Sequence, residues 1–261
     1  MMLRQFEDHI GAPLFATARK SRLTPLGEQV YNEARRELDH FDRTVSAIKG
    51  LSRAEMGFVR VAATPSVATA LLPPILHAFL CAHPNLQLDM RDMTSAAVQQ
   101  ELERDRADVG IASIGPVPGL DRHRLFSDPF GVVCRADHRM AKDWSDLTWA
   151  DLVGEDFIAN GLCAQISDPG FRPVLEASRL SVPNTASLLG LVRAGVGISL
   201  LPKLAVPPEY TDIVFLPLKD IEARREVWLV TQPRQMLTPA ARAFVKAVRG
   251  ADIPKRHGVW A

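Results

Sequence analysis

Residues 58–82 read FVRVAATPSVATALLPPILHAFLCA, which is the pattern of a strand, a turn and a helix in succession. The apolar run 58–63 predicts a strand, and the Thr-Pro-Ser at 64–66 predicts a turn. Residues 68–82 have the apolar spacing of a helix, with an irregularity near its start at the Pro-Pro pair 73–74. A strand followed by a helix is the repeating unit of α/β folds, so this stretch predicts the fold class of the chain.

The alternation of strands and helices continues to about residue 250. After residue 82 the expected strands are 86–91, 108–112, 130–135, 156–159, 180–182, 196–201 and 226–231. The expected helices are 95–104, 149–153, 185–194 and 239–249, with shorter ones after the 161–170 loop and at Pro202. Strands joined by helices predict βαβ units in a mainly parallel sheet with helices on both faces.

A second series of strands and helices begins near Gly131 and divides the body of the chain into two lobes. Two α/β lobes joined in this way form a clamshell. Ligands of such folds lie in the crevice at the carboxyl ends of the strands. The pattern therefore predicts a protein that binds a ligand between its lobes.

The bulk composition is that of an ordinary globular protein. Of the 261 residues 47% are hydrophobic and 23% charged, and the formal net charge is +1. No global basic field attracts nucleic acid, so any DNA contact must come from a local patch.

Three cysteines, Cys81, Cys134 and Cys163, are far apart in the chain and suit reduced thiols better than disulfides or a zinc site. Because no segment approaches about 18 consecutive apolar residues and no apolar leader is found, we expect a cytoplasmic protein without a membrane span.

One long helix is expected over residues 24–49, ended by Gly50 and followed by a hinge. Thr24 is a suitable N-cap and Pro25 a suitable first helical residue, with Glu28 beside the positive end of the helix dipole. Apolar residues then recur at steps of three and four: Tyr31, Ala34, Leu38, Phe41, Val45 and Ile48. Such a heptad seam favours a coiled-coil partner. The alternative is a single amphipathic helix that lies on its own domain.

The residues before this helix contain a local basic patch. Residues 3–10 have the spacing of an amphipathic helix with Gly11 as its end, and residues 13–15 supply an apolar anchor. A basic loop follows, in which no acidic residue occurs between Asp8 and Glu28. Its cations are Arg19, Lys20 and Arg22.

The order of these segments resembles that of the LysR-type transcriptional regulators. Five stretches carry the resemblance: residues 3–15 with 22–27, residues 57–62, residues 73–84, residues 108–111 and residues 191–202. They are similar to the end of the family's recognition helix and wing, its first effector-domain strand, its LP-x-x-L-x-x-F-x-x-x-x-P stretch, its DVGI strand and its LV-x-x-G-x-GI-x-LLP segment. Each motif alone is weak, whereas five in the right order are specific.

The resemblance implies an α/β chain in four parts. These are a remnant of a winged helix-turn-helix (1–23), a long linker and dimerisation helix with its hinge (24–57), a two-lobed effector-binding domain like the type 2 periplasmic binding proteins (58–250) and a tail (251–261). Lobe I would comprise residues 58–129 and 227–250, and lobe II residues 130–226. Promoter DNA and a small-molecule effector would be the partners, with a homodimer that pairs into a homotetramer through helix 24–49 and the effector domains.

The resemblance also places the start of this sequence inside the third helix of the helix-turn-helix. A recognition helix reads bases mainly with its N-terminal residues, so we expect sequence-specific DNA binding by these residues alone to be impaired. Arg19, Lys20 and Arg22 would lie on the wing and neutralise phosphates, unless they are an ordinary solvated charge run. Arg4 and Gln5 would lie on the remaining end of the helix, as backbone contacts or as plain surface residues.

Six polar residues are candidates for the effector pocket: Thr64, Ser66, Ser113, Asn160, Thr185 and Ser187. Thr64 and Ser66 open a helix whose free N–H groups tolerate an anion. Ser113 and Asn160 follow strands in different lobes and would face the same crevice. The pair at 185 and 187 starts the helix before Gly195 and would complete the wall. For the residues at helix starts the alternative is capping alone.

Enzyme chemistry has little support in the sequence. The seven histidines are scattered without metal-ligand spacing, and no nucleophile elbow, P-loop or G-x-G-x-x-G motif occurs. Asp105 and Asp108, beside Arg104 and Arg106, are expected to form a solvated turn. We therefore expect no catalytic residue, metal or cofactor. The alternatives to a regulator are a cytoplasmic small-molecule-binding clamshell without DNA function and an enzyme with two α/β lobes.

Overall fold

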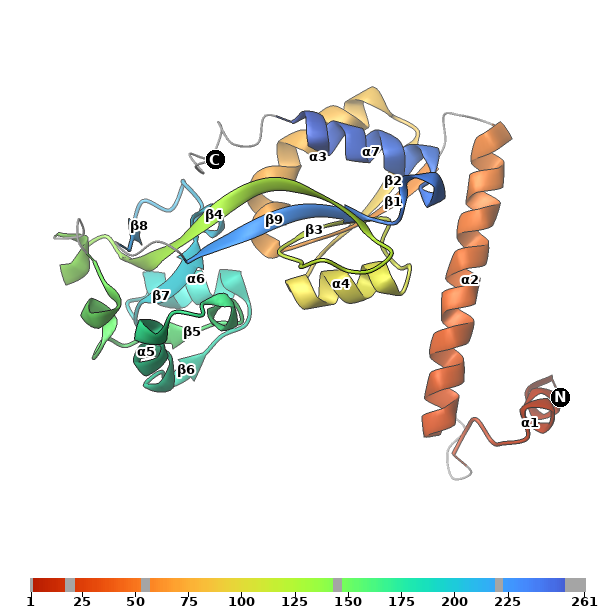
Figure 1. Cartoon of the computed structure of the whole chain (residues 1–261), viewed down its shortest axis with the longest axis horizontal. Helices are drawn as coiled ribbons and strands as arrows, with labels where there is room; N and C mark the ends of the chain where they lie inside the picture. Colours follow the sequence, from red (N-terminus) through yellow and green to blue (C-terminus); the bar gives the residue numbers. More distant parts are fainter. Residues whose placement is uncertain (1, 17–21, 53–56, 143–146, 219–222, 252–261) are drawn as a thin grey trace.

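Figure 1 shows a long helix beside a two-lobed α/β body. The computed structural model describes residues 2–16, 22–52, 57–142, 147–218 and 223–251. The chain begins with α1 (Met2–Ile10) and the long helix α2 (Pro25–Ser52). The expected end of α2 at Gly50 is wrong, because the helix continues to Ser52 although a glycine costs a helix about 1 kcal/mol. The predicted hinge and tail lie almost entirely outside the described residues.

The first lobe, called lobe I, contains the parallel strands β1 (Gly57–Ala63), β2 (Leu86–Asp92) and β3 (Val109–Ala112), with β1 between the other two. Its helices are the π-helical turn η1 (Val67–Leu71), α3 (Leu72–Ala82), α4 (Ser95–Glu103), the 3-10 turn η8 (Arg234–Met236) and α7 (Pro239–Gly250). The predicted irregularity before α3 is confirmed. Prolines 73 and 74 cannot donate to the preceding turn, and that turn is the wide η1.

Two long strands connect the lobes. β4 (Asp121–Arg135) leaves lobe I and β9 (Arg224–Thr231) returns to it, and the two pair from Asp121 with Thr231 to Pro129 with Arg224. The strand order is β2-β1-β3-β9-β4-β7, with β8 also on β4. The prediction of a mainly parallel sheet is therefore wrong, because the outgoing and returning strands are neighbours and every ladder of β4 and β9 is antiparallel. The strand expected at 130–135 is only the second part of β4.

The second lobe, lobe II, is built around the far end of β4. Its strands are β5 (Ile158–Ala159), β6 (Leu180–Ser181), β7 (Ser199–Pro202) and β8 (Ile213–Pro217). Its α-helices are α5 (Arg172–Glu176) and α6 (Thr185–Arg193). Its 3-10 turns are η2 (Arg139–Ala141), η4 (Trp149–Leu152), η5 (Cys163–Gln165), η6 (Pro169–Phe171) and η7 (Lys203–Ala205). Gly195, with φ of +78°, follows α6 as predicted.

Each lobe packs apolar side chains on both faces of its sheet, as predicted. In lobe I, α3 and α7 cover one face, where Phe79 and Phe244 meet edge to face with ring centroids 5.2 Å apart. The other face is covered by α4. The absence of a side chain at Gly57 lets α7 approach β1 closely. A Cβ at this position would lie only 2.8 Å from the Cβ of Ala240. Within the described ranges, every helix is too short or too polar to cross a lipid bilayer.

Candidate functional site

The N-terminal segment is held against the start of α2. Glu7 Oε1 accepts hydrogen bonds from the backbone N–H groups of Leu14 (2.7 Å) and Phe15 (3.3 Å). Gly27, in the first turn of α2, permits this contact, since a Cβ there would lie 2.0 Å from the Leu14 carbonyl oxygen. Thr24 Oγ1 accepts a hydrogen bond from the Gly27 N–H at 2.9 Å, which confirms it as the N-cap of α2. The segment and α2 therefore form one unit.

The predicted DNA contacts belong to this unit. Gln5, on α1, and Arg22 are exposed. Arg22 precedes Leu23, which forms an antiparallel bridge with Phe15 and so closes the two ends of the basic loop. Three predicted contacts lie outside the described residues: Arg19, Lys20 and the side chain of Arg4.

Three predicted effector residues meet where the strands of lobe I end. Thr64 follows β1, and its N–H donates to a β3 carbonyl at 3.1 Å. Its hydroxyl oxygen is buried and has no hydrogen-bond partner among the described residues. Ser66 Oγ accepts from Arg225 Nη2 at 2.7 Å. Ser113 Oγ donates to the Glu226 carbonyl at 2.8 Å. β3 and the start of β9 thus gather the three side chains.

A buried ion pair between Arg225 and Asp128 lies at the junction of the lobes, and sequence reasoning missed it. The Nη2–Oδ2 distance is 2.6 Å, and the side chains are 2% and 0% exposed. Asp128 Oδ1 also accepts from the Leu204 N–H of lobe II at 3.2 Å, while Arg225 donates to Ser66 of lobe I. Burial lowers the pKa of Arg225, and the charge of Asp128 opposes that effect. The available signal was a pair of arginines in an otherwise apolar strand pattern.

Asn160, the lobe II candidate that follows β5, is held by three hydrogen bonds. Its amide nitrogen donates to the Ser199 hydroxyl (3.1 Å) and the Leu200 carbonyl (2.9 Å), both on β7. Its amide oxygen accepts from the Leu162 N–H at 2.9 Å. Both ends of the amide are therefore engaged within lobe II.

Thr185 and Ser187 lie in the first turn of α6. The cap of this helix is Asn184, whose Oδ1 accepts from the Ser187 N–H at 2.9 Å, so Thr185 is not the cap that the sequence suggested as an alternative. Thr185 is half-buried and Ser187 is exposed. Within the part of the chain that the structure describes, no hydrogen bond joins either side chain to lobe I.

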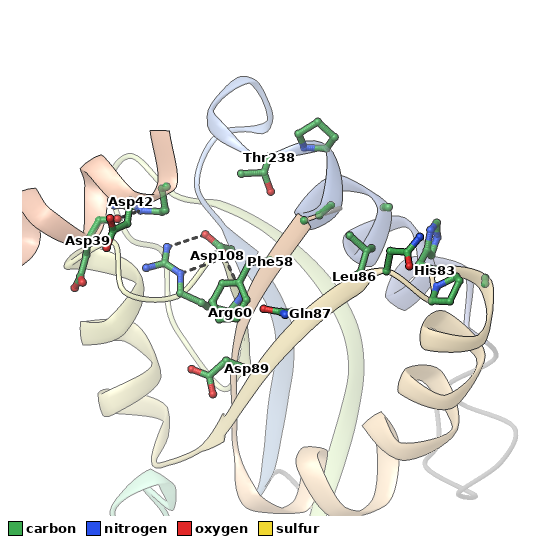
Figure 2. A pocket seen from close by; sticks show the side chains of 18 of the residues that line it. Asp39, Asp42, Phe58, Arg60, His83, Leu86, Gln87, Asp89, Asp108 and Thr238 are labelled. Carbon is green, nitrogen blue, oxygen red and sulfur yellow. Dashed lines mark hydrogen bonds and ion pairs between the residues drawn. The ribbon is translucent and has the colours of Figure 1, made fainter. Parts of the chain in front are cut away.

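A cavity of about 800 Å³ lies between α2 and lobe I. Figure 2 shows Asp39 and Asp42 on α2 at one side of the cavity, and Phe58, Leu86 and Gln87 from the starts of β1 and β2 at another. Arg60 and Asp108 form a two-point ion pair in its wall, with Arg60 Nη2 2.8 Å from Oδ1 and Nε 3.3 Å from Oδ2. None of the six predicted effector residues lines this cavity.

An ion pair between Arg43 and Asp105 ties α2 to lobe I beside this cavity. Asp105 has φ of +58°, in the left-handed region, and is the one non-glycine residue with a positive φ among those described. Burial lowers the pKa of Arg43 to about 10, and the neighbouring charge of Arg60 contributes. The expected solvated turn at 105–108 is therefore wrong, because Asp108 is buried against Arg60 and Asp105 binds Arg43.

The cysteines occupy two kinds of environment. Cys134 and Cys163 are buried in lobe II, and burial raises the pKa of Cys134 to about 11 and that of Cys163 above its usual range. Cys81 is exposed on α3. A thiol held in its protonated form is a poor nucleophile. Among the described side chains, no group of three His, Cys, Asp or Glu could hold a metal ion.

Comparison with known proteins gives consistent matches. A family model described as the LysR substrate binding domain matches residues 52–252. The chain is 29% identical over 271 residues to the uncharacterized HTH-type transcriptional regulator YbhD of Escherichia coli K12, covering 99% of this chain and 84% of that protein. It is 31% identical over 210 residues to the transcriptional activator protein LysR of the same organism, covering 77% and 67%. The solved structure of CbnR, a LysR family transcriptional regulator, has a TM-score of 0.67 at 19% identity, over 95% of this chain and 86% of that one, and shows a shared fold.

Proposed function

Because this chain belongs to the LysR family of transcriptional regulators, we propose that it binds a small-molecule effector between its lobes and promoter DNA through its N-terminal unit. It acts in the cytoplasm, by binding and not by catalysis. The effector-binding domain is residues 58–250, and the effector contacts are Thr64, Ser66 and Ser113 from lobe I and Asn160, Thr185 and Ser187 from lobe II.

The unpartnered hydroxyl of Thr64 is the observation that carries this proposal. A buried hydroxyl without a hydrogen-bond partner lowers the stability of the folded chain. Its presence is explained if a bound ligand supplies the missing hydrogen bond. It lies at the start of the η1 turn, where backbone N–H groups favour an anion. Ser66 is two residues away, and its hydroxyl already accepts a hydrogen bond from the positively charged Arg225. These features favour a small carboxylate as effector.

Thr64→Val tests the effector site. We expect the variant to be at least as heat-stable as the wild type, because the substitution keeps the shape and removes an unpaired polar group. It loses the rise in Tm that the effector produces in a thermal-shift screen of small carboxylates, amino acids and aromatic compounds. Thr69→Val, at an exposed position in η1, keeps that rise. Equal shifts in wild type and Thr64→Val, or no stabilisation of the folded wild type by any compound, would count against the proposal.

The apolar seam of α2 supports assembly with further copies. Leu38 and Phe41 are 64% and 62% exposed, while Arg43, on the other side of the helix, faces lobe I. A second copy of α2 would bury this seam as a coiled coil. We assign a homodimer to this contact and a homotetramer to further contacts of the effector domains. Effector binding then biases the arrangement of the subunits, provided that the effector has different affinity for the two arrangements.

The basic loop supplies the proposed contact to DNA. Arg19, Lys20 and Arg22 neutralise phosphates, so DNA affinity falls as the salt concentration rises. The logarithm of the DNA association constant falls linearly with the logarithm of the salt concentration. Replacing Arg22 by alanine should make this negative slope shallower by about 0.9 in duplex-binding titrations. Arg179→Ala, an exposed cation of lobe II, leaves the slope unchanged. Absence of any DNA affinity would instead favour a small-molecule-binding clamshell without DNA function.

A further inference from the structure

A second cavity, called the α7 groove, has a volume of about 870 Å³ and is lined by residues of β4, β9, η8 and α7. β4 lines it with residues 121–123, β9 with Leu229 and Thr231, and α7 with residues from Arg242 to Gly250. Leu229 is four residues along β9 from Arg225, which corresponds to about 13 Å. The α7 groove is therefore separate from the crevice between the lobes and from the cavity beside α2.

The α7 groove is lined by an excess of positive charge. Besides Arg122, which lies over the ring of Trp228, four exposed cations line it: Arg234, Arg242, Lys246 and Arg249. Among the described residues that line it, the one carboxylate is Asp121, which accepts a hydrogen bond from the Arg234 backbone N–H at 3.3 Å. None of the four side chains forms an ion pair with a carboxylate in the described ranges. Because the whole chain has a net charge of only +1, this is a strong local surplus.

The fold accounts for only part of these cations. Arg249 lies in the last turn of α7, where the helix dipole favours a positive charge. Arg242 lies near the first turn, where the same dipole disfavours it, although its Nη1 donates to the Leu237 carbonyl at 2.8 Å. Lys246 follows Arg242 by four residues on the same flank of the helix, and like charges at this spacing repel. An anion in the groove would offset both costs.

We propose that the α7 groove binds a small polyanion with two or more carboxylate or phosphate groups. Arginine side chains bind such groups through paired charge-assisted hydrogen bonds, and Lys246 adds a point charge. The volume is in the range of metabolite sites in proteins. The groove lies on β4 and β9, the two strands that connect the lobes, so its occupant would act on their junction independently of the effector crevice.

Isothermal titration of the full chain with citrate and with inorganic pyrophosphate, in separate experiments at low salt, tests the proposal. We expect one of them to bind, and the choice between them distinguishes a polycarboxylate from a phosphorylated ligand. Arg242→Gln/Lys246→Gln should weaken that binding about ten-fold or more, the effect of losing a charge-assisted hydrogen bond. Lys246→Gln alone, at a side chain with no hydrogen bond in the described structure, should weaken it in the same direction.

The matched control removes two exposed cations elsewhere, Arg104→Gln/Arg179→Gln, and should leave the affinity unchanged. Thr64→Val should also leave it unchanged, which separates this site from the proposed effector site. Three results would overturn the proposal: no binding of either anion to the wild type, an equal loss in the control variant, or duplex DNA as the sole ligand that depends on Arg242 and Lys246.

Discussion

At the scale of single residues, the pair of Arg225 and Asp128 should have the largest effect on stability. Both side chains are almost fully buried, so removing one charge leaves the other desolvated without compensation. We expect Asp128→Asn to lower the free energy of unfolding by about 3–5 kcal/mol, measured by urea denaturation.

An exposed ion pair provides the comparison for this variant. Arg172 and Glu176 form an i, i+4 pair with side chains 79% and 63% exposed. Glu176→Gln should cost less than about 1 kcal/mol. If both variants lost the same small amount, the junction of the lobes would not depend on the buried pair.

The cysteines give a second prediction, in chemical reactivity. Cys81 should react with a thiol reagent such as DTNB in the native protein at about pH 8, while Cys134 and Cys163 should react only after unfolding, since burial keeps them protonated. The rise in the pKa of Cys134 from 9.0 to about 11 also predicts how stability depends on pH. The unfolded thiol ionises first as the pH rises through this interval, so the folded state loses stability there. Reaction of more than one thiol per chain in the native protein would contradict the prediction.

The residues that sequence reasoning placed correctly are those with a local signal. Thr24 caps α2 and Thr64 directly follows β1, because caps and strand ends are set by neighbours in the chain. Asp128 and Arg225 are 97 residues apart, and no local pattern connects them. Asp108 was misjudged for a related reason: the charges next to it suggested solvent, whereas its partner Arg60 is 48 residues away.

At the scale of elements, α2 offers a test of assembly. Leu38→Glu/Phe41→Glu places charges in the exposed seam and should dissociate the oligomer in sedimentation velocity, with the helical circular dichroism retained. Gln29→Glu/His40→Glu adds the same charge on the opposite side of the helix and should leave the assembly intact. An oligomer that survives in the seam variant would show that α2 is not the contact.

Helices could be predicted from the sequence better than strand pairing. The spacing of apolar residues marked α2, α3, α4, α6 and α7 to within a few residues, because a helix repeats over its own neighbours. β8 was missed, and β4 was found only in its second part, since both are defined by antiparallel partners far along the chain. The position of the α7 groove likewise depends on β4 and α7 lining one cavity, which no sequence motif indicates.

At the scale of the whole molecule, the direction of α2 relative to the body depends on a small contact. The Arg43–Asp105 pair ties α2 to lobe I next to a cavity of about 800 Å³. Asp105→Gly keeps the left-handed backbone accessible and removes the carboxylate. We expect a broader distance distribution between spin labels on native Cys81 and on an introduced His40→Cys, measured by pulsed electron paramagnetic resonance.

A matched variant removes a carboxylate with an arginine partner elsewhere. Asp137→Gly takes away the exposed partner of Arg135 in lobe II and should leave the distance distribution unchanged. If Asp105→Gly gave the narrow distribution of the wild type, other contacts would hold α2 in place.

The path of the chain through β4 and β9 also determines how the molecule could be cut. The chain leaves lobe I once and re-enters it once, and the exit and the return face each other where Pro129 pairs with Arg224. Lobe II is thus a single excursion with neither terminus, while α2 and α7 both attach to lobe I (Figure 1). A short hairpin turn in place of residues 130–223 would close the ladder and leave lobe I with both its helical layers. In genetic terms we expect lobe II to behave as an insertion that can be exchanged between relatives without changing where the chain leaves and re-enters lobe I.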